Sequence, residues 1–249
     1  MGSLTIPARF NGPPASGNGG YVAGSLARLL GLPVVDVSLR APPPLDRPLT
    51  VRQADPQPGG QAAGQAGALS IVLLDGDTEL ARASAGELSV DLPPAPDHDA
   101  ACAAGALGRL RAASRSSPYA RCFGCGIQRH DGLQLLPGPV GDDGVVATGW
   151  TPAASLADGD GRIGIEIIWT ALDCPAGFAW SNRLPDASPM MTARMIARIV
   201  APISAGEQLV VAAWPIAQEG RKLHAGTAIF GRDGGVRAYS RQLWLLPRG

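Results

Sequence analysis

The segment GNGGYVAGSLARLL, from Gly17 to Leu30, predicts a helix that begins directly after a glycine-rich loop. Asn18 is the expected N-cap, because its side-chain oxygen can accept a hydrogen bond from a free backbone N–H in the first turn. Apolar residues then recur at helical spacing, at Val22, Leu26, Leu29 and Leu30. Gly31 and Pro33 end the pattern, so we expect one amphipathic helix that buries a single face.

Several strand-like runs follow this helix. They cover residues 34–40, 48–54, 67–74 and 79–90. Asp75-Gly76-Asp77 lies between the last two runs, and an Asp-Gly pair is typical of a tight hairpin turn. The first half of the chain is therefore predicted to be one helix followed by an antiparallel meander.

The second half repeats this plan after a stretch rich in proline and alanine. We interpret residues 93–118 as a linker with a short surface helix, which leaves 1–92 and 119–249 as two repeats. Strands are expected near 133–136 and 143–150. The helix expected at 163–180 has one apolar face, formed by Ile165, Ile168, Trp169 and Leu172. Further strands are predicted at 191–199, 207–217, 222–231 and 235–246.

The closing hairpins of the two halves are alike. SIVLLDGDTELARAS (70–84) and GTAIFGRDGGVRAYS (226–240) both read as strand, Asp-Gly turn, strand and Arg-Ala. A helix with a bent antiparallel sheet, present twice, is an α+β arrangement in which each sheet wraps its own helix. Two such sheets can join edge to edge, which hides their edge strands.

Composition limits the classes of function. The chain has 249 residues, of which 45% are hydrophobic, with 21 basic and 21 acidic side chains. Zero net charge disfavours nucleic acid or an anionic membrane as a partner, and no apolar run reaches the length of a membrane-spanning helix. The first residues lack an export signal, so we predict a cytoplasmic protein whose four cysteines are reduced.

Several stretches resemble thioesterases of the hotdog fold. GNGGYVAGSLARLL is similar to the glycine-glycine loop and helix of acyl-CoA thioesterase II proteins. ALDCPAGFA (171–179) resembles the helix of phenylacetyl-CoA-type thioesterases, in which an acid precedes a glycine by four residues, here Asp173 and Gly177. CFGCG with GLQLLPG (122–138), WTALDCPAG and RAYSRQLWL together resemble uncharacterised actinobacterial thioesterase-like proteins. The resemblance implies a double hotdog fold and hydrolysis of an acyl-CoA or related acyl thioester.

The positions that match these families are divided between the two halves. The first half has the Asn-Gly-Gly turn at 18–20, but Ala27 stands where the acid is expected. The second half has Asp173, but Gly-Ile-Glu at 164–166 replaces the glycine turn. Since hotdog active sites lie between two units, the resemblance implies one composite site in which the Gly20 amide faces Asp173. The mirror-related site would have neither group.

Thioester hydrolysis gives each of these positions a role. A backbone N–H at a helix N-terminus can stabilise the oxyanion, which is the role expected of Gly20. The carboxylate of Asp173 can activate water or attack the carbonyl carbon itself. By its similarity to a thioesterase II glutamine, Gln242 would orient the water. The expected substrate-binding residues are Asn18, Gly19, Trp169 and Glu166.

The same residues also have ordinary structural explanations. The glycine turn can simply start a helix, and Asp173 can pair with backbone N–H groups freed around Pro175. Gln242 can be a polar residue on a half-exposed strand, and Glu166 a solvated helix residue. Trp169 either closes an acyl tunnel or packs between helix and sheet.

Cys122 and Cys125 form a C-x2-C pair, and His130 follows shortly after them. A structural zinc site needs four ligands, and the sequence offers no second pair, since Cys102 and Cys174 are isolated. We therefore predict a tight turn with small buried thiols, and neither a metal site nor a redox site. Cys174 is disfavoured as a nucleophile because a neighbouring carboxylate raises the pKa of a thiol.

These observations lead to one predicted function and two alternatives. The prediction is a thioesterase that needs no metal or redox cofactor and acts on an acyl-CoA or acyl-carrier thioester, with the question of a homo-oligomer left open. The alternatives are a non-catalytic acyl-thioester binding protein and a hotdog hydratase or dehydratase. The hydratase is disfavoured because it needs a His and acid pair, and none of the three histidines lies in either helix region.

Overall fold

The structure, a computed structural model, describes residues 2–54, 69–114, 116–184 and 189–248. This described part contains three α-helices, α1 (Gly19–Leu30), α2 (His98–Ala113) and α3 (Ile165–Arg183). Short 3-10 helices cover Ala8–Phe10 and Ala154–Leu156. The strands are β1 (Gly2–Thr5), β2 (Val34–Leu39), β3 (Pro48–Gln53), β4 (Ser70–Asp75), β5 (Thr78–Ala85), β6 (Gly138–Pro139), β7 (Val146–Trp150), β8 (Met191–Ile199), β9 (Leu209–Glu219), β10 (Lys222–Gly231) and β11 (Val236–Leu245).

These strands form one sheet in which every neighbouring pair is antiparallel. Its order is β1-β3-β4-β5-β2-β8-β11-β10-β9-β7-β6, so the strands of the first half occupy one side and those of the second half the other. The sides meet where β2 pairs with β8, from Val34 opposite Arg198 to Ser38 opposite Arg194. The predicted edge-to-edge joining of two sheets is confirmed.

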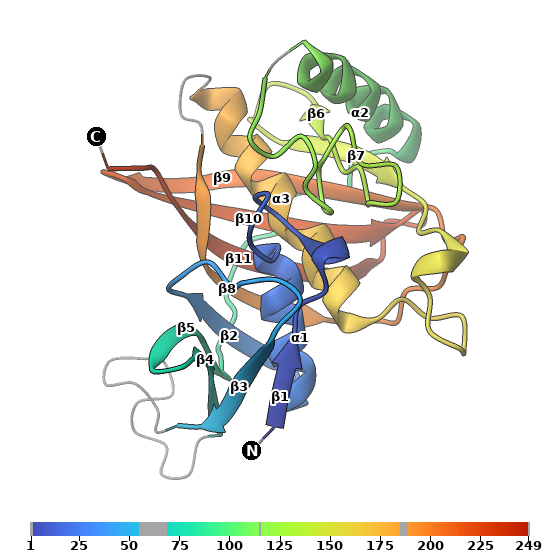
Figure 1. Cartoon of the computed structure of the whole chain (residues 1–249). Helices are drawn as coiled ribbons and strands as arrows, with labels where there is room; N and C mark the ends of the chain where they lie inside the picture. Colours follow the sequence, from blue (N-terminus) through green and yellow to red (C-terminus); the bar gives the residue numbers. More distant parts are fainter. Residues whose placement is uncertain (1, 55–68, 115, 185–188, 249) are drawn as a thin grey trace.

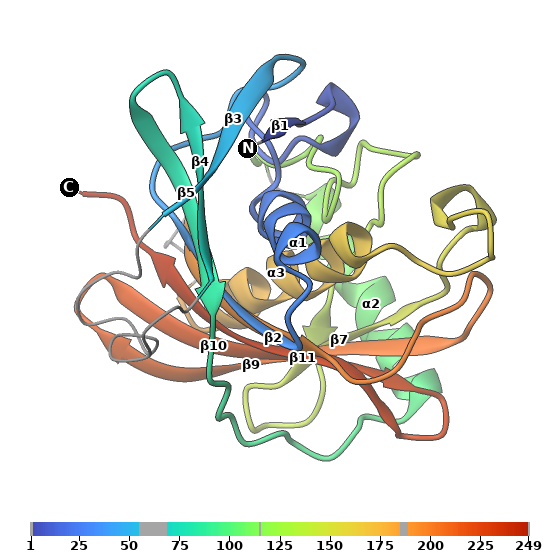
Figure 2. The same cartoon turned by 90° about the horizontal axis from the view of Figure 1, so that it is seen from below.

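Both α1 and α3 lie inside the curve of this sheet, next to each other (Figures 1 and 2). Leu26 of α1 and Leu172 of α3 belong to the same buried cluster as Val37 of β2 and Ile229 of β10. The two helix-and-sheet units therefore share one hydrophobic core. This arrangement confirms the predicted α+β class with two helices wrapped by bent antiparallel sheet.

Helix α1 begins and ends at the predicted residues. The Oδ1 atom of Asn18 accepts a hydrogen bond from the backbone N–H of Tyr21 at 2.9 Å, as expected of an N-cap. At the other end, Gly31 adopts a left-handed conformation with φ of 63°, which a glycine reaches without steric cost. The N-terminus of α1 is therefore fixed in place by its cap.

The strand predicted at 133–136 is wrong. The backbone N–H groups of Leu133 and Leu135 donate to the carbonyl oxygens of Phe123 (2.8 Å) and Gly124 (3.0 Å). This segment therefore pairs with the cysteine-containing turn, and β6 begins only at Gly138. Alternating buried leucines suit such a segment as well as a strand, which is why the pattern misleads here.

Other predicted elements are present with shifted ends. The run expected at 67–74 corresponds to β4, and its residues 67–68 lie outside the described part of the chain. β1 has no alternating pattern and is not predicted from the sequence. The helix expected within 93–118 is α2, which packs on β7 so closely that a Cβ on Gly105 would lie 2.3 Å from Thr148 Oγ1 (Figure 1).

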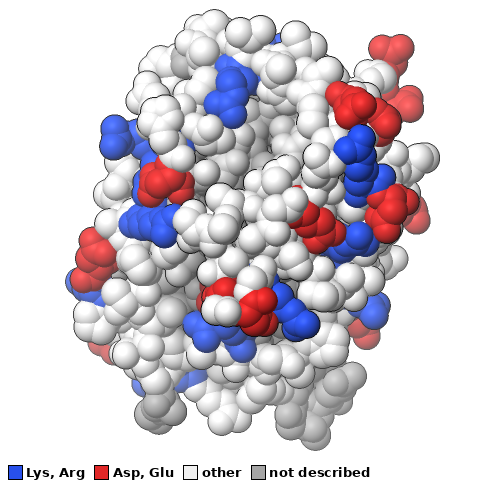
Figure 3. All heavy atoms as spheres, turned by 90° about the vertical axis from the view of Figure 1, so that its right-hand side faces the viewer, with Lys and Arg blue, Asp and Glu red and all other residues white. Residues whose placement is uncertain are grey.

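Charges of both signs are mixed on the surface. On the face shown in Figure 3, Lys and Arg side chains lie among Asp and Glu side chains, with a hollow between them. Among the residues that the structure describes, no helix has both the length and the apolar character needed to span a membrane.

Candidate active site

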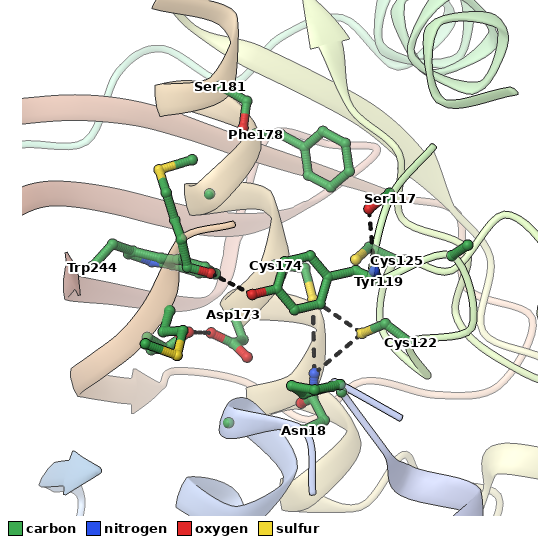
Figure 4. Close-up of a pocket in the computed structure, with 18 of the residues that line it drawn as sticks. Asn18, Ser117, Tyr119, Cys122, Cys125, Asp173, Cys174, Phe178, Ser181 and Trp244 are labelled. Carbon is green, nitrogen blue, oxygen red and sulfur yellow. Dashed lines mark hydrogen bonds between the residues drawn. The ribbon is translucent and has the colours of Figure 1, made fainter. Parts of the chain in front are cut away.

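A cleft of about 1630 Å³ lies where the two halves meet. Its walls come from the loop before α1, the end of α2, the turn that contains Cys122, the middle of α3 and the start of β8. Polar and charged groups line it beside apolar side chains that include Phe178, Met190 and Trp244. Figure 4 shows Asn18, Cys122, Asp173 and Cys174 converging on this space. A large cleft with a few convergent polar groups is the usual form of a small-molecule site.

Asp173 is held at this cleft by groups from two other elements. Its Oδ2 atom accepts a hydrogen bond from the backbone N–H of Gly20 at 2.8 Å, and its Oδ1 atom accepts one from the Thr192 hydroxyl at 2.6 Å. Burial raises the pKa of Asp173 to about 6, against the opposing effect of these two hydrogen bonds. A buried acid is thus fixed between α1, α3 and β8.

Glycine is required at position 20 because α1 and α3 touch there. A Cβ on Gly20 would lie 2.5 Å from the Trp169 carbonyl oxygen and 2.7 Å from Asp173 Cβ. A Cβ on Gly19 would lie 3.3 Å from Asp173 Oδ2. The glycine turn therefore lets the helix N-terminus reach the acid, as predicted from the split motif.

The oxyanion-stabilising role expected of the Gly20 amide does not fit its hydrogen bond. Its N–H donates to Asp173, so this amide holds the acid and does not point at a substrate carbonyl. Within the described residues, the neighbouring N–H of Gly19 has no hydrogen-bond acceptor, and Gly19 lines the cleft. The N-terminus of α1 thus offers one amide to the acid and a second to the cleft.

Some of the remaining predicted site residues line the cleft and others do not. Asn18 lines the cleft with Gly19, whereas Glu166, Trp169 and Gln242 do not. Trp169 is buried in the core between helix and sheet. Glu166 forms an ion pair with Arg28 of α1. Because this pair lies next to the buried Ala27, the region expected for the mirror-related site carries an ion pair and core packing.

Gln242 uses its whole amide within the protein. Its Nε2 atom donates to the Leu172 carbonyl oxygen at 2.6 Å and to Ser240 Oγ at 2.9 Å, and its Oε1 atom accepts from Trp244 Nε1 at 2.9 Å. The structure thus places Gln242 behind Trp244, which itself lines the cleft. An orienting effect on water remains a prediction for this residue.

Thr192 contacts the acid but carries no functional signal in the sequence. It is the second residue of β8, and its hydroxyl reaches Asp173 across the gap between strand and helix. The alternation of apolar and polar residues along 191–199 places Thr192 on a sheet face, but it does not say which helix residue lies opposite. Only the register of strand and helix reveals this partner.

The cysteines also differ from the prediction, because Cys174 is not isolated. Its Sγ atom lies 3.8 Å from that of Cys122, and the Sγ atoms of Cys122, Cys125 and Cys174 all lie within 4.8 Å of one another. Asn18 Nδ2 points at two of these sulfurs, at 3.6 Å from Cys122 and 3.7 Å from Cys174 (Figure 4). A separation of 49 residues between Cys125 and Cys174 hides this cluster in the sequence.

Comparison with known proteins adds information on the fold. No protein-family model matches the chain, and no curated protein matches it. Among solved structures, the tesB protein of Mycobacterium avium subspecies paratuberculosis has a TM-score of 0.59 and 14% identity, over 98% of this chain and 91% of that one. A proposed thioesterase II from Thermobifida fusca has a TM-score of 0.61 and 13% identity, over 99% of this chain and 92% of that one.

A third structure is described by its fold. It is a conserved protein of unknown function with a hotdog fold from Alicyclobacillus acidocaldarius, with a TM-score of 0.58 and 12% identity over 99% of this chain and 93% of that one. At such identities the likeness concerns the fold. Taken with the two helix-and-sheet units and their shared sheet, these similarities show that the chain has the double hotdog fold.

Proposed function

We propose that the protein hydrolyses an acyl thioester, carried by CoA or by a carrier protein, in the cleft between its two repeats. The observation that carries this proposal is the buried Asp173, held by the Gly20 amide of the other half and by Thr192. Structural similarity to a protein described as a proposed thioesterase II supports it. We take residues 1–92 and 119–249 as the two repeats, and the cytoplasmic location stays a prediction.

Asp173 acts as the general base in this proposal. Its carboxylate accepts a proton from a water molecule while the water oxygen attacks the thioester carbonyl carbon. The Gly19 N–H at the positive end of α1 stabilises the resulting oxyanion. The carbon–sulfur bond then breaks, and the leaving thiolate takes the proton from Asp173, so the acid returns to its starting form.

The cleft also accounts for both parts of such a substrate. Phe178, Met190 and Trp244 offer apolar contact to an acyl chain. Arg111, whose side chain donates to the neutral Asn182 amide, lines the same cleft and can pair with a phosphate group of a carrier.

Thiol release from a panel of acyl-CoA substrates, short, long and aromatic, tests the proposal. We expect wild type to release thiol from at least one substrate and Asp173→Asn to lose this activity. Asp142→Asn is the matched control, since Asp142 is an exposed aspartate in the turn before β7. Binding without release on every substrate would favour the non-catalytic binding protein. Within the described residues no histidine lines the cleft, which counts against a hydratase.

A further inference from the structure

We propose that Cys122, Cys125 and Cys174 bind one Zn²⁺ ion whose fourth coordination position faces the cleft. A zinc ion with Zn–S distances of about 2.3 Å and tetrahedral angles holds its sulfurs about 3.8 Å apart. The Cys122 and Cys174 sulfurs lie 3.8 Å apart, and the third sulfur lies within 4.8 Å of both. One pair of sulfurs thus already has the spacing that one ion requires, and the distances to the third sulfur exceed it by at most about 1 Å.

The backbone holds the C-x2-C turn in a shape that aims both sulfurs the same way. The Gly126 N–H donates to the Cys122 carbonyl oxygen at 2.8 Å, and a Cβ at Gly126 would lie 2.5 Å from that oxygen. The N–H groups of Leu133 and Leu135 donate to carbonyl oxygens within the turn and hold it in place. The third ligand sits on α3, a long helix, so all three sulfurs belong to well-supported backbone.

Gly124 permits the third cysteine to approach. A Cβ at this position would lie 2.8 Å from Cys174 Sγ and 3.5 Å from Asn18 Nδ2. A larger residue within the C-x2-C turn would therefore push the turn away from α3. The small residue keeps the three sulfurs together although they come from two separate parts of the chain.

The surroundings suit a group of thiolates. Binding of Zn²⁺ displaces three thiol protons and leaves a net charge of minus one at the cluster. Asn18 Nδ2 donates to two of the sulfurs, and its orientation is fixed because Oδ1 accepts from the Tyr21 N–H. The backbone N–H groups of Gly124 and Cys125 donate to Cys122, and the N-terminus of α1 adds its positive end. N–H donors of this kind orient and stabilise metal-bound sulfur.

The fourth position is left to a ligand from the cleft. Asp173 accepts hydrogen bonds from Gly20 and Thr192 and, within the described residues, is not part of the group of ligand atoms formed by the three sulfurs. The Tyr119 hydroxyl donates to the Met190 carbonyl oxygen. All three cysteines line the cleft, so water or a sulfur ligand can reach the ion. Zinc prefers sulfur among such ligands. If the proposed function holds, the thiol released by hydrolysis is the chemical class that would bind there.

Zinc content under reducing conditions is the first test, with a phosphine as the reductant so that no added thiol competes. We expect one zinc ion per chain in wild type and in Cys102→Ser. Cys102 is the matched control, because it is the exposed fourth cysteine. Cys122→Ser and Cys174→Ser should each lower the Zn²⁺ affinity by at least about 100-fold. Asn18→Ser keeps a capping oxygen but loses the amide donor, so we expect about a 10-fold loss.

Cobalt substitution in the folded wild-type protein removes any dependence on variants that fail to fold. Co²⁺ should give thiolate-to-cobalt charge-transfer absorption together with the d–d bands of a tetrahedral ion. A small added thiol should shift the d–d bands if the fourth position is open, and unchanged bands would overturn that part. If reduced wild type takes up neither Zn²⁺ nor Co²⁺, the site is rejected. None of these readouts uses turnover, so they are independent of the proposed hydrolysis.

Discussion

At the scale of single residues, the proposed chemistry depends on one carboxylate. We expect Asp173→Asn to lower thioester turnover at least about 100-fold, because an amide cannot accept the proton from water. Folding should be preserved, since the asparagine oxygen can still accept the Gly20 N–H and the Thr192 hydroxyl can turn to accept from the new amide. Thiol release and thermal unfolding on the same preparation measure both effects. Turnover equal to that of Asp142→Asn would remove Asp173 from the mechanism.

Thr192 is a positioning residue for that carboxylate. Thr192→Val keeps the shape of the side chain but removes the hydrogen bond to Asp173 Oδ1. Loss of a hydrogen bond to a charged group costs about 1.5 kcal/mol, which predicts roughly a 10-fold lower kcat. Thr192→Ser should restore most of the activity, because the hydroxyl returns. A serine variant as slow as the valine variant would mean that packing, and not the hydrogen bond, matters at this position.

The sequence predicts some of these residues and misses others for clear reasons. The pairing of Gly20 with Asp173 could be predicted because a known fold brings the start of one helix to the middle of the other. The contact of Thr192 with Asp173 and that of Cys174 with Cys122 could not be predicted, because each depends on how α3 is rotated relative to its neighbours. The sequence likewise does not show that the Gln242 amide forms its hydrogen bonds within the protein, because one of its partners comes from α3.

At the scale of elements, the contact between α1 and α3 depends on small residues. A Cβ on Gly24 would lie 2.7 Å from Glu166 Cα and 2.8 Å from Trp169 Cβ. We expect Gly24→Ala to destabilise the protein by about 1–3 kcal/mol through overpacking, although alanine favours a helix by about 1 kcal/mol. Urea unfolding measures this change. Activity should fall as well, because the Gly20 amide moves away from Asp173.

Gly159→Ala is the matched control for this packing argument. No atom lies within 4 Å of a Cβ built at Gly159, so its stability should stay close to that of wild type. If both alanine variants unfolded at the same urea concentration, close helix packing would not be the reason for glycine at position 24. The comparison separates a steric effect from a general effect of removing glycine.

Element prediction succeeds where periodicity and turns agree. The cap at Asn18 and the alternation along β8 mark elements that the structure confirms. The segment 133–136 shows the limit, because its leucines are buried against a turn and not against a neighbouring strand. An apolar run reports that a segment is buried, but not which backbone it will pair with.

At the scale of the whole molecule, an ion pair ties the two halves where their sheets meet. Arg194 of β8 binds Asp36 of β2 through two hydrogen bonds, one of them from Nε to Oδ1 at 2.8 Å. Asp36 is 8% exposed, whereas the Arg194 side chain is 38% exposed. The pair is therefore asymmetric in its contact with water.

This asymmetry predicts unequal effects of removing either partner. Arg194→Gln leaves a buried carboxylate unpaired and should destabilise the protein by about 1–3 kcal/mol. Asp36→Asn leaves a guanidinium that can reach solvent, so we expect a loss below about 1 kcal/mol. Chemical denaturation of both variants measures the difference. An Asp36 variant less stable than the Arg194 variant would contradict the argument.

The general plan of the molecule follows from its internal repeat. Two similar hairpins and two helices predict two like units, and the need to cover edge strands predicts their joining. The sequence does not show how the wall of the cleft is completed. That wall uses the end of α2, from the stretch interpreted as a linker, and the turn that contains Cys122.

The division of amide and acid between the halves means that the two repeats cannot replace each other in the proposed mechanism. A single-unit protein that works as a symmetric pair must preserve both groups in every copy. In the proposed mechanism each repeat of this chain supplies one of them, so the mechanism requires neither an acid at position 27 nor a glycine turn at 164–166. Ala27 is instead buried in the core, and Glu166 forms an ion pair with Arg28. A chain with two copies of the first repeat would lack the acid, and one with two copies of the second would lack the glycine turn, so neither could complete the proposed site.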